Sequence, residues 1–305
     1  MKELFERNFT AGAMTLSGIE AVPTSEPRCV VLAIHGSGYG GRYWDMPEPL
    51  SSLLRLGRDL GFRVIAVDRP GYGASSGVAP ERLGINAQAE VIGALTAQIH
   101  AEAPTVPVFL MGHSFGALLV VRVVAGEAAN CVAAIDVAGL PVQWRPEVRA
   151  QVEAALRGEP SAFSSQQSRL ALYFGPPGTF DPQVLDLERA LLQRVPRLEV
   201  EESLDSARVL REYAPLVRLP VQHTVAQYEG SIAGGQPALA RGRALFSAAP
   251  LVASHLQANA GHNVSLHKIG RAYHLRAFSF FEEVLASVAP ANDVPHVLDQ
   301  LEATQ

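Results

Sequence analysis

The sequence is poor in cysteine and in lysine, with two residues of each among 305. Two cysteines are too few for the disulfide framework of a small secreted domain. Cys29 and Cys131 each begin a strand-like apolar run, so we expect buried free thiols rather than a disulfide or a metal site. The net charge of −5 gives no argument for nucleic acid or an anionic membrane as a partner.

Long apolar runs are also missing. No stretch approaches the ~18–20 uninterrupted apolar residues of a membrane-spanning helix. The N-terminal residues lack the apolar core of a signal peptide. The chain does have many hydrophobic residues, 48%, against 18% charged residues, a balance that is typical of a globular protein with a large core. We expect a cytoplasmic protein with no membrane contact.

Short apolar runs alternate with helix-like segments along most of the chain. This alternation predicts an α/β fold with a mostly parallel, doubly wound sheet of about eight strands. One interval of about eighty residues contains helix-like segments and no clear strand, which is too long for a simple crossover. We therefore expect a core over residues 1–139 and 219–290, a helical cap over 140–218 and a C-terminal tail over 291–305.

The segment Gly112-His113-Ser114-Phe115-Gly116 lies between a short apolar run and a longer run rich in Ala, Leu and Val. A buried strand followed by a packed helix explains this pattern, with the five residues as the turn between them. So sharp a turn brings backbone close to backbone, and glycine at both ends avoids a clash of Cβ atoms. The pattern is that of a nucleophile elbow. The alternative is an ordinary glycine-serine turn, and the rest of the chain has to decide.

A serine nucleophile needs a base, and the base needs an acid that orients it. In parallel sheets such groups gather beyond the carboxyl ends of strands. Of nine histidines, His262 and His35 lie at such strand ends, and we favour His262, which follows the last strand. For the acid, Glu229 follows the strand before it, and Asp136 lies near the end of another. We favour Glu229 and keep Asp136 as the alternative.

An acyl-transfer site also needs N–H donors for the developing oxyanion. Phe115 follows Ser114 at the start of the expected helix, where its N–H is not used by the helix. A second donor is expected from the glycine-rich loop over residues 36–41, after the first buried strand. That loop does not have the Gly-Lys-Ser/Thr ending of a phosphate-binding loop.

Taken together, these motifs resemble the α/β-hydrolase fold superfamily along nearly the whole chain. They are, in chain order, His35-Gly36, Asp68-Arg69-Pro70-Gly71-Tyr72-Gly73-Ala74-Ser75, Gly112-His113-Ser114-Phe115-Gly116 and Gly261-His262. The resemblance implies nucleophile, acid and histidine in the order Ser114, Glu229 and His262. It also implies that the N–H groups of Ser37 and Phe115 form the oxyanion hole.

The surroundings of the acid depart from the family pattern of Pro, Gly and Asp. Pro220, Ala226 and Glu229 keep the spacing, with alanine in place of glycine and glutamate in place of aspartate. In some members the acid follows the strand after the nucleophile, where Asp136 lies. The resemblance therefore leaves both carboxylates open.

A serine in this position favours acyl chemistry over the family branches that use aspartate there. We expect cleavage of an ester, lactone or thioester of a medium-sized, partly apolar small molecule through an acyl-enzyme, with no cofactor and no metal. Residues expected at the substrate pocket are Tyr39, Trp44, His113, Trp144 and Tyr173. The loop Gly-Gly-Arg-Tyr-Trp also resembles hydrolases of bacterial natural-product pathways. The alternatives are a cyclase or acyltransferase of the same fold, and a ligand-binding protein that retains the triad. The sequence leaves a monomer and a homodimer equally open.

Overall fold

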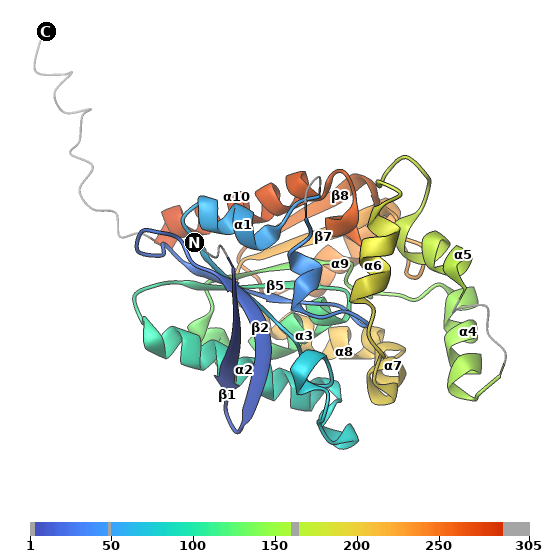
Figure 1. The fold of residues 1–305 in the computed structure, drawn as a ribbon, viewed down its shortest axis with the longest axis horizontal. Coiled ribbons are helices and arrows are strands. Elements are labelled where there is room, and N and C mark those ends of the chain that lie inside the picture. Colours follow the sequence, from blue (N-terminus) through green and yellow to red (C-terminus); the bar gives the residue numbers. More distant parts are fainter. Residues whose placement is uncertain (1–3, 48–49, 160–164, 289–305) are drawn as a thin grey trace, which may run out of the picture.

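The computed structural model describes residues 4–47, 50–159 and 165–288, so the expected tail over 291–305 lies outside the described residues. Its centre is an eight-stranded sheet in the order β1-β2-β4-β3-β5-β6-β7-β8 (Figure 1). The strands are β1 (Phe5–Ala11), β2 (Met14–Ala21), β3 (Val30–Ile34), β4 (Arg63–Val67), β5 (Val108–His113), β6 (Ala134–Ala138), β7 (Val221–Tyr228) and β8 (Val252–Gly261). The pairs β1–β2 and β2–β4 are antiparallel, and all other pairs are parallel. The predicted α/β fold is confirmed.

Helices cover both faces of the sheet (Figure 1). One face carries α1 (Leu53–Asp59) and α10 (Gly270–Val288), and the other carries α2 (Ile85–Glu102), α3 (Phe115–Val124) and α9 (Gly235–Leu245). A large hydrophobic cluster lies between the sheet and each helical layer. The central strands β3 and β5 are buried along their whole length. This explains their continuous apolar sequences, because a strand covered on both faces has no side for polar residues.

Residues 140–218, here called the inserted segment, connect β6 to β7. Its helices are α4 (Pro146–Leu156), α5 (Gln166–Arg169), α6 (Val184–Leu191), α7 (Arg197–Ser203) and α8 (Ser206–Tyr213), with a π-helical turn over Leu170–Phe174. A short break separates α7 from α8. The break falls where the carbonyl oxygens of Ser203 and Leu204 accept hydrogen bonds from Trp144 and Arg149. α8 then packs against α3, so the segment ends on the core.

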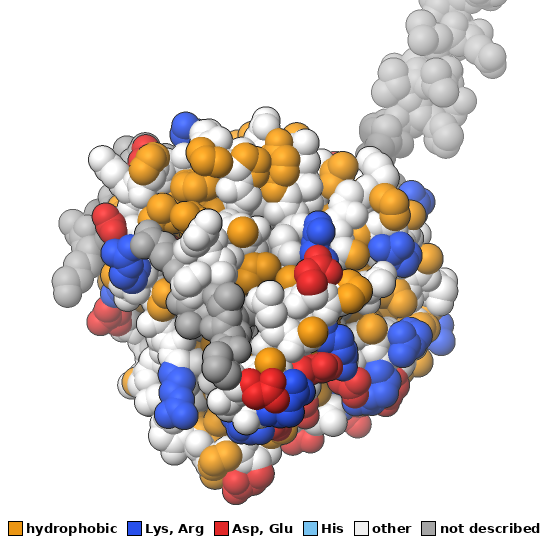
Figure 2. Space-filling model, turned by 90° about the vertical axis from the view of Figure 1, so that its right-hand side faces the viewer, with side chains coloured by type: hydrophobic (Ala, Val, Ile, Leu, Met, Phe, Trp, Pro, Cys, Tyr) orange, Lys and Arg blue, Asp and Glu red, His pale blue; other side chains and the backbone are white. Residues whose placement is uncertain are grey.

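The outer face of the inserted segment has a mixed surface. Figure 2 shows the side of the molecule that includes this segment, with basic and acidic side chains interspersed at the lower right of the view and hydrophobic side chains gathered toward the top. Arg149–Glu153 on α4 and Arg197–Glu201 on α7 are exposed ion pairs of the inserted segment. Such pairs contribute only about 0.3–0.5 kcal/mol each. The position of the segment therefore depends on its buried contacts.

Candidate active site

Ser114 lies at the sharp turn between β5 and α3. Its φ and ψ angles are 56° and −121°, a combination that non-glycine residues rarely adopt and that stores strain. A Cβ atom at Gly116 would lie 2.3 Å from the Ile34 carbonyl oxygen, and one at Gly112 would lie 2.7 Å from Ala117 Cα. The two glycines thus allow the close backbone approach that the motif predicted.

Two hydrogen bonds join Ser114 to a buried carboxylate. His262 follows β8 directly, and its Nε2 lies 2.9 Å from Ser114 Oγ. Its Nδ1 lies 2.7 Å from an oxygen of Glu229, which follows β7. Because a carboxylate only accepts, Nδ1 carries the proton and Nε2 presents its lone pair to the serine hydroxyl. Glu229 is 2% exposed and His262 is 4% exposed, so water competes little for these bonds.

Asp136, the alternative acid, lies within β6. Its two oxygens accept hydrogen bonds from Gln222 Nε2 at 2.7 Å and from the Tyr273 hydroxyl at 2.8 Å. Burial raises the pKa of its carboxyl to about 6, against the opposing effect of these two hydrogen bonds. The structure thus places Glu229, and not Asp136, against the ring of His262.

His113 connects the turn at Ser114 to the loop that carries His262. Its Nε2 donates to the His262 carbonyl oxygen at 2.7 Å, and its ring stacks on Tyr43 with 4.9 Å between centroids. Burial, and then the neighbouring His262, lower the pKa of His113 to about 3. The ring is therefore neutral near pH 7 and holds the backbone without adding a charge to the site.

The N–H groups of Ser37 and Phe115 find no acceptor among the described residues. Both residues line the same cavity as Ser114. Gly36 packs so closely that a Cβ atom there would lie 2.9 Å from Ser114 Cβ. Phe115 also begins α3, where the helix dipole favours negative charge. An anionic oxygen near Ser114 would thus have two unused donors within the same cavity.

The cavity beside Ser114 and His262 has a volume of about 430 Å³. Most of its wall is apolar. Residues that supply this wall include Trp144, Val152, Tyr173, Leu192, Val195 and Val200, all from the inserted segment. Two larger, shallower hollows of about 740 and 580 Å³ are lined by neither Ser114 nor His262. We regard the 430 Å³ cavity as the candidate site because it alone of these three contains the serine and the histidine.

Four of the five expected pocket residues, Tyr39, His113, Trp144 and Tyr173, line this cavity. Trp44 does not. It ends a 3-10 turn over Gly41–Trp44 that directs its side chain into the core, where it is 0% exposed. There its ring meets that of Tyr43 edge-on at 5.0 Å between centroids. The expectation that Trp44 borders the substrate is therefore corrected.

A polar cluster interrupts the apolar wall. The Tyr39 hydroxyl donates to Glu188 on α6 at 2.6 Å and accepts from Asn263 Nδ2 at 2.8 Å. Arg169 pairs with the same carboxylate, and its guanidinium lies 5.3 Å from the centroid of the Tyr173 ring. Sequence reasoning missed three of these residues. Only Asn263 carried a readable signal, because it directly follows His262.

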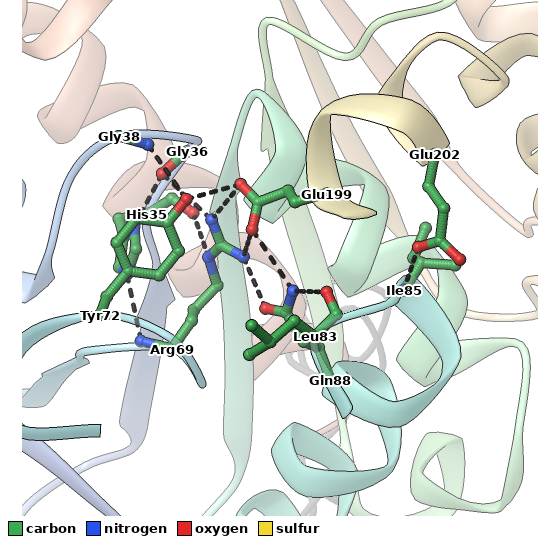
Figure 3. Close-up of polar contacts among 10 residues, drawn as sticks. All are labelled: His35, Gly36, Gly38, Arg69, Tyr72, Leu83, Ile85, Gln88, Glu199 and Glu202. Carbon is green, nitrogen blue, oxygen red and sulfur yellow. Dashed lines mark hydrogen bonds and ion pairs between the residues drawn. The ribbon is translucent and has the colours of Figure 1, made fainter. Parts of the chain in front are cut away.

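A second polar cluster was also missed (Figure 3). It lies behind the glycine-rich loop over residues 36–41, here called the Ser37 loop. It joins Arg69 and Tyr72 to Glu199 of α7, and both members of the Arg69–Glu199 ion pair are fully buried. Arg69 and Tyr72 belong to the motif over residues 68–75, which signalled a family resemblance without a role for either side chain. Glu199 lies in an acidic run that is typical of a solvent-facing helix, so its burial had no signal.

Over the described part of the chain, no group of three or more His, Cys, Asp or Glu side chains could hold a metal ion. Within those same residues, no helix has both the length and the apolar character needed to cross a membrane. Cys29 and Cys131 are free thiols, the first buried and the second partly exposed.

The fold and the arrangement of the site define a class of protein. Residues 30–272 match the alpha/beta hydrolase family, and the chain belongs to that family.

The individual proteins that this chain resembles match it over only part of its length or at low sequence identity. A monoglyceride lipase homolog from monkeypox virus is 34% identical over 101 residues, which are 32% of this chain and 33% of that protein. The chain thus matches about a third of the length of this curated relative. A highly thermostable carboxyl esterase from Bacillus coagulans has a TM-score of 0.71 at 16% identity, over 93% of this chain and 100% of that one. A bromoperoxidase from Bacillus anthracis has a TM-score of 0.69 at 14% identity, over 91% of this chain and 100% of that one. At these identities the structural similarities show the fold alone.

Proposed function

We propose that this protein is a serine hydrolase that cleaves a carboxylic ester of a medium-sized, partly apolar small molecule. The observation that carries the proposal is the hydrogen-bonded series Ser114–His262–Glu229, of which Ser114 and His262 line an apolar cavity. Ser114 is the nucleophile, His262 the base, and Glu229 the acid that orients the imidazole.

The reaction has two halves that use the same groups. His262 Nε2 takes the hydroxyl proton as Ser114 Oγ attacks the ester carbonyl carbon. The resulting oxyanion is stabilised by the N–H groups of Ser37 and Phe115. Cleavage of the C–O bond releases the alcohol, which takes its proton from His262, and leaves an acyl-enzyme. Water then attacks the acyl carbon with His262 again as base, and His262 returns the proton to Ser114 Oγ as the acyl–Oγ bond breaks and the carboxylic acid is released.

The choice of an ester is supported by the family and by the similarity of the chain to a monoglyceride lipase homolog and, in fold, to a carboxyl esterase. Lactones and thioesters fit the same chemistry. The cavity volume of about 430 Å³ falls within the range of about 300–1,000 Å³ for small-molecule sites. Because much of its apolar wall comes from the inserted segment, we propose that this segment is a cap that binds the acyl or alkyl part of the substrate.

The proposal is tested by intact-mass measurement after brief exposure to a small fluorophosphonate. Ser114→Ala and His262→Ala serve as matched variants, and circular dichroism checks that both are folded. We expect one adduct on the wild-type protein and none on either variant. Esters, thioesters and lactones of increasing chain length are then screened for hydrolysis. A folded wild-type protein that forms no adduct and hydrolyses none of them would refute the proposal and favour a ligand-binding role. An adduct with no hydrolysis, but with acyl transfer or ring closure, would favour the transferase alternative.

A further inference from the structure

A carboxylate of the inserted segment reaches behind the loop that carries Ser37. Glu199 on α7 and Arg69, which follows β4, are both 0% exposed. The two side chains form a bidentate pair, with N–O distances of 2.9 and 3.0 Å (Figure 3). A guanidinium and a carboxylate in this fork-to-fork arrangement fix each other in direction as well as distance.

Arg69 continues from this pair to the first half of the Ser37 loop. Its Nε donates to the His35 carbonyl oxygen at 2.9 Å, and its Nη2 donates to that of Gly36 at 3.2 Å. The backbone N–H of Arg69 also donates to His35 Nε2 at 3.1 Å. The peptide groups that precede Ser37 are thus held by a side chain that Glu199 orients.

Tyr72 holds the second half of the loop. Its hydroxyl accepts a hydrogen bond from the Gly38 N–H at 3.2 Å and donates to Glu199 at 2.8 Å (Figure 3). The Ser37 side chain also favours the charged form of the same carboxylate and so helps to lower its pKa. Glu199 is therefore linked to the backbone on both sides of Ser37, through Arg69 before it and through Tyr72 after it.

The charge of Glu199 is essential to this arrangement. Burial favours the protonated carboxyl, but the charge of Arg69 and the hydrogen bonds from Arg69, Ser37 and Tyr72 hold the pKa of Glu199 below its ordinary value. The Arg69 guanidinium also lies 5.1 Å from the centroid of the ring of Phe115, the residue whose N–H is the other unused donor. A neutral residue at 199 would leave a buried cation next to both donor residues.

We propose that Glu199 is a positioning residue that orients the Ser37 N–H toward the oxyanion, so that the cap takes part in catalysis. This inference rests on the proposed function, because it requires that an oxyanion forms at Ser114. The carboxylate does not touch the substrate. It acts through Arg69 and Tyr72, which hold the loop on both sides of Ser37.

Glu202, one turn further along α7, provides a matched control. Its carboxylate accepts a hydrogen bond from the Ile85 N–H at the start of α2, and so also joins α7 to the core (Figure 3). No hydrogen bond of Glu202 reaches residues 36–38 among the described residues. Glu202→Gln thus weakens a contact between cap and core and leaves the support of the Ser37 loop unchanged.

The test compares Glu199→Gln, Tyr72→Phe and Glu202→Gln with the wild-type protein, using p-nitrophenyl butyrate. Loss of an oxyanion donor lowers kcat about 100- to 1,000-fold, and misorientation of a donor that is still present should cost roughly 10- to 100-fold in kcat. We expect the smaller loss, roughly 10- to 100-fold in kcat, for Glu199→Gln and Tyr72→Phe. KM should change less than about threefold. Glu202→Gln should keep both constants. Tyr72→Phe leaves the ion pair intact and so tests the inference even if Glu199→Gln does not fold.

Hydrogen–deuterium exchange of peptides that cover residues 36–41 provides a readout independent of turnover. Exchange there should become faster in Glu199→Gln and Tyr72→Phe, and stay unchanged in Glu202→Gln. Unchanged exchange in both loop variants, an equal loss of kcat in all three variants, or an effect confined to KM would overturn the inference. Failure of the proposed function would appear differently, as a wild-type protein that neither reacts with the fluorophosphonate nor turns over the ester, and it would overturn the inference as well.

Discussion

Replacement of Glu229 by glutamine removes the negative charge beside His262 and nearly preserves the volume of the side chain. The carboxylate has two contacts: one oxygen faces His262 Nδ1 at 2.7 Å, and the other accepts from the Ala226 N–H at 3.4 Å. An amide cannot reproduce both. If its NH₂ group faces the ring, Nδ1 must accept, and Nε2 then carries a proton toward Ser114 and cannot act as base. If its oxygen faces the ring, the NH₂ group opposes the Ala226 N–H.

In either orientation the imidazolium that forms during attack loses its counter-charge in a site that is nearly closed to water. The corresponding change from acid to amide in a serine protease lowers kcat about 10⁴-fold. We expect Glu229→Gln to lower kcat by roughly 10³- to 10⁴-fold, equivalent to about 4–5.5 kcal/mol of transition-state stabilisation. KM should change little, because the carboxylate is behind the histidine and does not line the cavity.

The assay is steady-state hydrolysis of a p-nitrophenyl ester, with thermal unfolding to confirm the native fold. Asp136→Asn is the matched control, because Asp136 is also a fully buried carboxylate at a neighbouring strand but contacts Gln222 and Tyr273. The control should keep kcat within about threefold. If Asp136→Asn is the more damaging change, or if Glu229→Gln keeps a tenth of the activity, the assignment of the acid is refuted.

Three further predictions concern stability and specificity. Gly116→Ala should lower the free energy of unfolding by about 3 kcal/mol or more, because its Cβ would meet a backbone oxygen at 2.3 Å. Gly77 has open space around it, so Gly77→Ala should leave the free energy of unfolding nearly unchanged. Urea denaturation measures both. The raised pKa of Asp136, about 6 against 3.8, means that the folded state binds the proton more tightly, so stability should fall on the order of 3 kcal/mol as pH rises from about 4 to 6. Asp136→Asn should flatten that part of the Tm–pH curve, and an unchanged curve would contradict this cause. Val152→Trp should fill the cavity wall and lower kcat/KM for a decanoate ester at least tenfold relative to an acetate ester. Equal effects on the two esters would show that the acyl chain binds elsewhere.

Much of the site could be predicted because it depends on local rules. A short apolar run, a Gly-x-Ser-x-Gly turn and a second apolar run can form a strand, a tight turn and a helix, and the structure has that order around Ser114. The positions of His262 and Glu229 follow from another simple rule, that the carboxyl ends of parallel strands lie along one edge of a sheet. Whether these residues perform the proposed roles stays a prediction.

The remaining features depend on contacts between distant segments. Trp44 lies next to the glycine-rich loop in sequence, but a 3-10 turn directs it into the core, and nothing local specifies that direction. Arg69 and Glu199 are 130 positions apart, and α7 presents a buried glutamate within an acidic run. Such burial depends on how the inserted segment packs on the core, which periodicity and composition do not encode.

The buried pair of Arg69 and Glu199 also restricts how ligands exchange with the cavity. Lifting α7 away from the sheet would separate two charges that have no water around them, and such a motion is strongly unfavourable. The contacts between α4 and α7 carry no buried ion pair of this kind: Val148, Val152 and Leu204 form part of a small apolar cluster, and Arg149 donates a hydrogen bond to the Leu204 carbonyl oxygen. Apolar contacts of this kind can part at lower free energy than a desolvated ion pair. We therefore expect α7 to stay in place on the core while ligands exchange with the cavity.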